Sequence, residues 1–146
     1  LGINAGGFSI GRLTAGNTPD KPVRGRTSMD KLEYFKSRIE ATISPMEFMQ
    51  VSRADPAKML LVDVRNAPPE KMGGKIVGAL HIPQSALPDH LSELPRDRII
   101  VVYCWDVWCN LAARAAITLL ENGFDALELI GGFAAWNALY FPTENL

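Results

Sequence analysis

The sequence has little cysteine, little net charge and no long apolar run, and each shortage excludes a class of protein. Two cysteines among 146 residues are too few for a disulfide framework. No apolar run approaches the roughly 18 residues of a membrane-spanning helix, so no membrane association is expected. A formal net charge of −1, without blocks of like charge, argues against a protein that binds nucleic acid. The expected setting is reducing and cytoplasmic.

The first 28 residues differ in composition from the rest of the chain. They are rich in glycine and proline, show neither helical nor strand periodicity, and lack the continuous apolar segment of a signal peptide. We interpret residues 1–28 as an arm or tail that could include vector-derived residues, with Met29 as the natural start. Two alternatives stay open: a disordered terminus, or an arm packed on the domain or on a second subunit of a homodimer. Residues 29–146 are expected to form one domain.

From Met29 onward, apolar strands are predicted to alternate with helices. The predicted strands are residues 59–64, 79–82, 99–104 and 126–130. The predicted helices are residues 30–41, 44–51, 110–122 and 133–139, with one or two helical turns within 85–94. In the first of these helices, Leu32, Phe35 and Ile39 share one face. The alternation predicts an α/β fold with a central parallel sheet and helices on both faces.

Cys104 lies where chemistry gathers in such sheets, at the carboxyl end of a buried strand. A six-residue loop and then a helix follow it. Because loop N–H groups and the positive end of a helix dipole converge there, we expect the pKa of its thiol to fall below about 8.5. Cys104 should then react faster with iodoacetamide than Cys109. The alternative is a buried structural cysteine.

A series of short motifs follows in order along residues 43–143. They are Asp63-Val64-Arg65, Glu70, Gly74 to Ala79 with Ile82-Pro83, Tyr103-Cys104, Ala112-Ala113-Arg114-Ala115-Ala116, Gly123-Phe124 and Gly131-Gly132-Phe133 with Trp136. Together they resemble the rhodanese domain family, although Lys75 stands where the family usually has histidine. The resemblance implies a rhodanese-like fold in which Asp63 and Arg65 brace the loops at the carboxyl edge of the sheet.

The same resemblance implies a function. It indicates a sulfurtransferase that carries sulfane sulfur as a persulfide on Cys104 and needs no cofactor. The partners would be a small sulfur donor and a thiol or protein acceptor. The alternative is a non-catalytic rhodanese-like module that senses redox state or binds a partner.

The loop after Cys104 departs from the family's common pattern, which supplies a cation, a glycine and a hydroxyl to a sulfur oxyanion. Here the loop reads Trp105, Asp106, Val107, Trp108, Cys109 and Asn110, with an acid, two tryptophans and no cation. It is similar to a subgroup with the loop Tyr-Cys-Trp-Gly-Pro-x-Cys-Asn, except that Asp106 and Val107 replace Gly-Pro. We therefore expect thiosulfate, a dianion, to bind weakly. Phosphatases of this fold need an arginine at position 110, where this chain has asparagine.

Two further residues each allow two interpretations. Cys109 could attack a Cys104 persulfide, which would release sulfide and leave a disulfide, or it could pack inward at the start of the helix. Arg114 lies one helical turn beyond Asn110 and could turn toward the site or remain on the surface. No metal site is expected, because two thiolates without further ligands cannot complete a zinc site.

Overall fold

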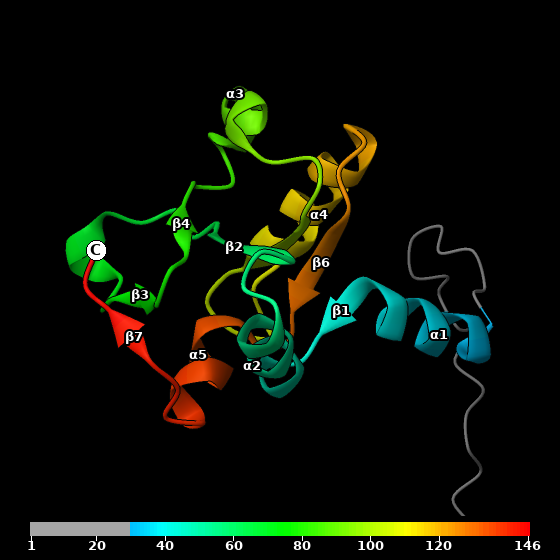
Figure 1. Ribbon diagram of the computed structural model, residues 1–146, viewed down its shortest axis with the longest axis horizontal. Coiled ribbons are helices and arrows are strands. Elements are labelled where there is room, and N and C mark those ends of the chain that lie inside the picture. Colours follow the sequence, from blue (N-terminus) through cyan, green and yellow to red (C-terminus); the bar gives the residue numbers. More distant parts are fainter. Residues whose placement is uncertain (1–29) are drawn as a thin grey trace, which may run out of the picture.

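A five-stranded parallel sheet forms the centre of the structure, a computed structural model that describes residues 30–146 (Figure 1). In spatial order its strands are β1 (Thr42–Ile43), β6 (Ala126–Leu129), β5 (Ile99–Tyr103), β2 (Met59–Asp63) and β4 (Leu80–His81). A small antiparallel pair, β3 (Lys75–Ile76) and β7 (Thr143–Glu144), lies apart from it. The predicted α/β fold with a central parallel sheet is confirmed. The expected arm and the homodimer built on it lie outside the described residues.

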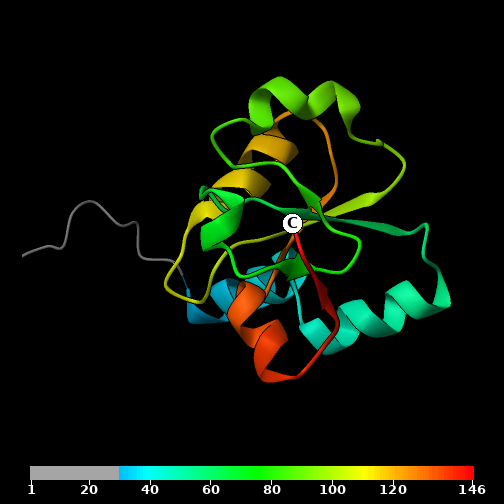
Figure 2. The same ribbon diagram turned by 90° about the vertical axis from the view of Figure 1, so that its left-hand side faces the viewer.

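Helices cover both faces of the sheet, as Figure 2 shows. On one face lie α3 (Leu87–His90) and α4 (Leu111–Glu121), and on the other lie α2 (Pro45–Ala54) and α5 (Gly132–Ala138). The short 3-10 helices η1 (Pro69–Lys71) and η2 (Leu91–Glu93) lie in the connections. Within residues 30–146, no helix is both long enough and apolar enough to cross a membrane.

Residues at its two ends explain where α2 begins and stops. The Ser44 side chain accepts a hydrogen bond from the backbone N–H of Glu47 at 3.1 Å, so Ser44 is the N-cap of the helix. The helix continues to Ala54, three residues beyond the predicted end. It stops there because Asp55 precedes Pro56, and the proline ring disfavours helical backbone in the residue before it.

Each central strand sends alternate side chains into two separate cores. On β5, Ile100 and Val102 face α4, whereas Val101 and Tyr103 face α2 and α5. Cys104 continues the first set and therefore points to the face that α4 covers. The strand is buried on both faces, as its unbroken apolar sequence predicts.

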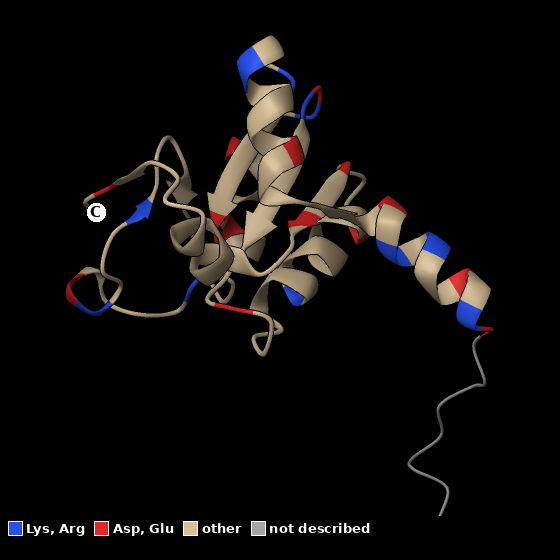
Figure 3. Ribbon diagram, turned by 90° about the horizontal axis from the view of Figure 1, so that it is seen from below, with Lys and Arg blue, Asp and Glu red and all other residues tan. Residues whose placement is uncertain are grey.

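Helix α1 (Lys31–Ala41) forms as predicted, but its apolar face is exposed among the described residues. Ile39 is 77% exposed, and Leu32 and Phe35 are each more than half exposed. The helix projects from the β1 edge of the sheet, where its contacts are with β1 and β6 (Figure 1). Acidic and basic residues are interspersed along it (Figure 3).

Candidate functional site

Cys104 directly follows β5 and is almost fully buried, with 2% of its surface exposed. Its thiol donates a hydrogen bond to the carbonyl oxygen of Cys109, with 3.3 Å between Sγ and O. The loop therefore curls around the sulfur and meets it again five residues later. The Cys104 sulfur is thus enclosed by the core on one side and by the loop on the other.

The tip of the loop is held by its own backbone. The N–H of Cys109 donates to the carbonyl oxygen of Asp106 at 3.0 Å, which closes a turn. The Asp106 carboxylate accepts from the N–H of Val107 at 2.6 Å. Val107 and Trp108 at the turn are 79% and 70% exposed, whereas Trp105 is half-buried. The loop thus presents two apolar side chains to solvent while its cysteines lie beneath.

Two backbone hydrogen bonds attach the start of the loop to the start of α5. The carbonyl oxygens of Cys104 and Trp105 accept from the N–H groups of Phe133 and Ala134, both at 2.9 Å. This approach requires glycine at position 132, because a Cβ there would lie 2.4 Å from the Cys104 oxygen. Gly132 also has a φ of +56°, which side chains disfavour.

A buried ion pair supports the loops beside the cysteine. Arg65 and Asp63 are both fully buried, and the Arg65 Nε donates to both Asp63 oxygens at 2.9 and 3.1 Å. The two remaining Arg65 nitrogens donate to the carbonyl oxygens of Met72 at 3.1 Å and Gly74 at 2.7 Å. Asp63 also accepts from the Tyr103 hydroxyl at 2.8 Å. The hydrogen bonds of this pair thus join the two residues to each other, to backbone carbonyls of the loop after β2 and to Tyr103.

The same guanidinium packs on the loop after Cys104. It lies 4.7 Å from the centroid of the Trp105 ring and 4.3 Å from that of Phe133. Arg65 therefore connects the loop after β2, the loop after β5 and the start of α5. Asp63 neutralises the charge of Arg65, and the pair holds these three segments together.

Burial raises the pKa of the Cys104 thiol to about 12, and a hydrogen bond with the Cys109 side chain acts in the same direction. Backbone N–H groups of Ala112 and Trp105 lower it, as expected, but burial outweighs them. The expectation of a lowered pKa is therefore wrong for the resting thiol. The loop and α4, which supply these N–H groups, also help to exclude the water that would solvate a thiolate.

Near neutral pH, iodoacetamide should alkylate Cys109 before Cys104 in the native protein, the reverse of the order expected from sequence. Because burial raises the pKa of the Cys104 thiol to about 12, little of it is thiolate near neutral pH, and its sulfur is buried. Raising the pH should speed the Cys104 reaction. The measurement is peptide mass after timed exposure, with the denatured protein as control. Faster native alkylation of Cys104 would contradict this account.

The structure places the remaining predicted residues as follows. Cys109 is half-buried and packs against the core beneath α4. Asn110 is exposed at the start of α4. Arg114 is exposed on that helix, and its guanidinium makes no hydrogen bond or ion pair within residues 30–146. Among the described residues, no group of three His, Cys, Asp or Glu side chains could hold a metal ion.

A cavity of about 480 Å³ lies beside the loop, lined in part by Cys109 and Asn110. Arg38 of α1 and Glu128 of β6 also line it, and sequence reasoning found neither. The sequence does single out Glu128, because its carboxylate interrupts the apolar run of residues 126–130. No sequence pattern singles out Arg38, because the residues around it do not indicate that α1 lies near the loop.

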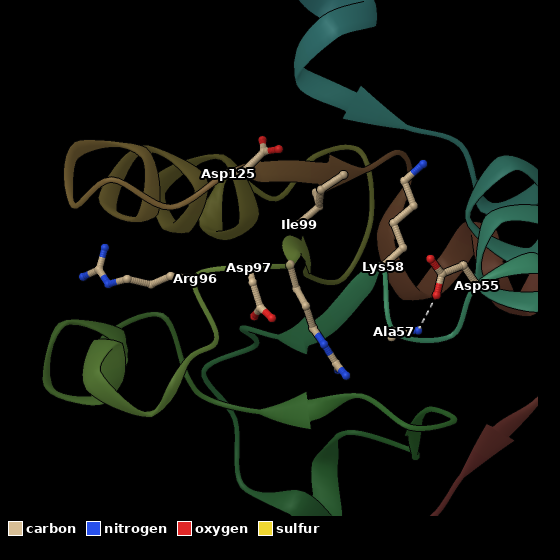
Figure 4. A pocket seen from close by; sticks show the side chains of 8 residues that line it. Asp55, Ala57, Lys58, Arg96, Asp97, Ile99 and Asp125 are labelled. Carbon is tan, nitrogen blue, oxygen red and sulfur yellow. Dashed lines mark hydrogen bonds between the residues drawn. The ribbon is translucent and has the colours of Figure 1, made fainter.

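A second hollow, shown in Figure 4, lies at the opposite ends of the strands, where β2 and β5 begin. Charged residues at the amino ends of β2 and β5 line it, among them Lys58 and Arg98. In parallel sheets the chemistry gathers at the carboxyl ends of the strands. This hollow is therefore separate from the Cys104 site.

The fold and this cysteine loop define a class of protein. The profile of the rhodanese-like domain matches residues 45–139, so the chain belongs to the rhodanese-like domain family. A crystal structure of a full-length protein from Lactobacillus plantarum is similar, with a TM-score of 0.76 and 30% identity, covering 80% of this chain and 97% of that one.

Two further proteins are similar in sequence, one named as an enzyme and one as a transcriptional regulator. A protein of Allochromatium vinosum named sulfurtransferase is 39% identical over 87 residues, which cover 57% of this chain and 76% of that protein. An HTH-type transcriptional regulator of Mycobacterium tuberculosis is 35% identical over 93 residues, or 64% of this chain. The matching part spans only 41% of that regulator's length.

Proposed function

We propose that this rhodanese-like chain is a sulfurtransferase that carries sulfane sulfur as a persulfide on Cys104 and passes it to a thiol or protein acceptor. The observation that carries the proposal is the buried Cys104 sulfur, enclosed by a loop that is itself attached to α5. The relative named sulfurtransferase supports the same activity.

The surroundings of Cys104 suit a bound sulfur chain better than a free thiolate. The N–H groups of Trp105 and Ala112 favour negative charge at the sulfur, while burial opposes charge on that atom. A persulfide carries its charge on the outer sulfur, one bond further from the buried Sγ. The enclosure also keeps water and stray thiols from the sulfur–sulfur bond.

The choice of donor follows from charge. No lysine or arginine occurs between Cys104 and Asn110, and Asp106 adds negative charge there. We therefore propose that thiosulfate is a poor donor. We also propose that the loop belongs to the subgroup with Tyr-Cys-Trp and a second cysteine. A reducing compartment such as the cytoplasm would keep both cysteines free.

Intact mass should increase by one sulfur atom after exposure of the reduced protein to a suitable donor. Thiosulfate, polysulfide and cysteine persulfide are tested in parallel, and cyanide or excess thiol should remove the added sulfur. Peptide mass should place the added sulfur on Cys104, and Cys109→Ser should still accept sulfur from small polysulfide. Sulfur that is found on Cys109 alone, or uptake that fails with every donor in the wild type, would refute the proposal.

The second candidate is a non-catalytic module that binds a partner through the loop. The 70% exposed Trp108 and the match to part of a transcriptional regulator favour it. In that case Cys104 takes up no sulfur under any condition. The intact-mass experiment therefore separates the two candidates.

A further inference from the structure

The cavity beside the loop is built by parts of the chain that are far apart in sequence. Arg38 comes from α1, Glu128 from β6, and Cys109 and Asn110 from the loop after Cys104. Its volume of about 480 Å³ suits a ligand of the size of a small peptide or amino acid. Cys104 is not among the residues that line it.

The cavity contains one acidic and one basic side chain that are not paired with each other. Glu128 and Arg38 make no ion pair within residues 30–146, although both line the same space. Burial alone raises the pKa of the Glu128 carboxyl, with no cation or hydrogen-bond donor offsetting it. A ligand that brings an ammonium to Glu128 and a carboxylate to Arg38 would satisfy both.

Cys109 connects this cavity to the buried sulfur. It lines the cavity on one side and packs against the core on the other, where its carbonyl oxygen accepts the Cys104 S–H. The two cysteine side chains are close enough to affect each other's ionisation. Cys109 therefore borders the cavity, whereas Cys104 does not.

We propose that this cavity binds a small amino-acid thiol or its persulfide, and that Cys109 relays sulfur between this ligand and Cys104. The inference rests on the proposed function, since it assigns the substrate class and the route for the sulfur of Cys104. Arg38 binds the carboxylate of the ligand and Glu128 its ammonium.

The relay is a sequence of sulfur exchanges without net oxidation or reduction. In loading, the Cys109 sulfur attacks the outer sulfur of the ligand persulfide, whose sulfur–sulfur bond breaks, and the ligand leaves as a thiol with the proton from Cys109. The Cys104 sulfur then attacks the outer sulfur of the Cys109 persulfide, and the proton of Cys104 passes to Cys109. The reverse sequence delivers sulfur to an acceptor thiol.

The test measures sulfur transfer from Cys104-loaded protein to three thiols by mass. Cysteine carries both charges, 3-mercaptopropionate only the carboxylate, and cysteamine only the ammonium. Arg38→Ala should slow transfer to cysteine and 3-mercaptopropionate about tenfold and leave cysteamine unchanged. Glu128→Gln should slow cysteine and cysteamine about tenfold and leave 3-mercaptopropionate unchanged. Comparing variant with wild type for each thiol cancels differences in intrinsic reactivity.

Controls separate this pattern from a general defect. Arg53→Ala removes an exposed arginine of α2 that does not line the cavity, and should change none of the rates. Cys109→Ser should slow transfer to all three thiols. Equal rates for Arg38→Ala, Glu128→Gln and wild type would overturn the proposal, and so would undiminished transfer in Cys109→Ser.

A binding measurement covers the case in which Cys104 takes up no sulfur. S-methylcysteine carries both charges but cannot exchange sulfur, so its affinity is measured calorimetrically on the unloaded protein. Both Arg38→Ala and Glu128→Gln should weaken it about tenfold, whereas Arg53→Ala should not. Absence of binding to the wild type would overturn the inference independently of the proposed function.

Discussion

Arg65→Met should lower the free energy of unfolding by roughly 3–5 kcal/mol, the largest loss of stability expected from a single substitution here. The change leaves the fully buried Asp63 carboxylate without its cation. It also removes both donors from the carbonyl oxygens of Met72 and Gly74. Urea unfolding followed by circular dichroism gives the difference from the wild type.

Arg96→Met is a matched control for that experiment. Arg96 also donates to a backbone carbonyl, that of Asn122 at 3.1 Å, and lies 4.3 Å from the centroid of the Phe124 ring. It is exposed, so its loss should cost about 1 kcal/mol or less. Asp63→Leu combined with Arg65→Met should recover part of the stability, because no buried charge remains. Equal losses of stability for Arg65→Met and Arg96→Met would show that burial of the Asp63–Arg65 ion pair does not explain the effect.

Gly132→Ala should cost roughly 2–4 kcal/mol and also slow sulfur uptake by Cys104. The added Cβ would lie 2.4 Å from the Cys104 carbonyl oxygen, so the loop and the start of α5 must separate. The hydrogen bonds from Phe133 and Ala134 to the loop are then weakened, each worth about 1 kcal/mol. The left-handed backbone adds about 1–2 kcal/mol for alanine.

Gly123→Ala separates the backbone penalty from the clash. Gly123 also has a positive φ, +79°, but its nearest neighbour to a Cβ is the flexible Arg96 side chain at 3.6 Å. This variant should lose only about 1–2 kcal/mol and keep its rate of sulfur uptake. Thermal unfolding and timed intact mass measure both effects. If Gly132→Ala loaded sulfur at the wild-type rate, the attachment of the loop to α5 would have no role in positioning Cys104.

The strands and the position of Cys104 follow from local sequence patterns. The apolar run ending at Cys104 forces a buried strand, and the helix after it requires the intervening loop to turn back over the sheet edge. Gly131-Gly132 likewise predicts a tight turn, and the structure shows that the second glycine makes room for the Cys104 carbonyl. These features depend on residues close together in the chain.

The properties that could not be predicted depend on contacts between distant segments. The pKa of Cys104 depends on how completely the loop and core exclude water, which no local pattern encodes. Arg38 and Glu128 are 90 positions apart in the sequence and line the same cavity only because α1 lies beside β6. The exposed apolar face of α1 is a third case, because helical periodicity shows a face but not what covers it.

The Asp63–Arg65 pair also limits how this sequence can diverge. A change of either residue alone passes through a protein with an unpaired charge in its core. Tyr103 extends the constraint, since its hydroxyl donates to Asp63 and accepts from the N–H of Ile76 at 3.0 Å. An apolar replacement of the ion pair would need several coordinated changes. Single steps are open to the exposed loop residues Val107 and Trp108, so the surface of the loop can change while the scaffold beneath it stays fixed.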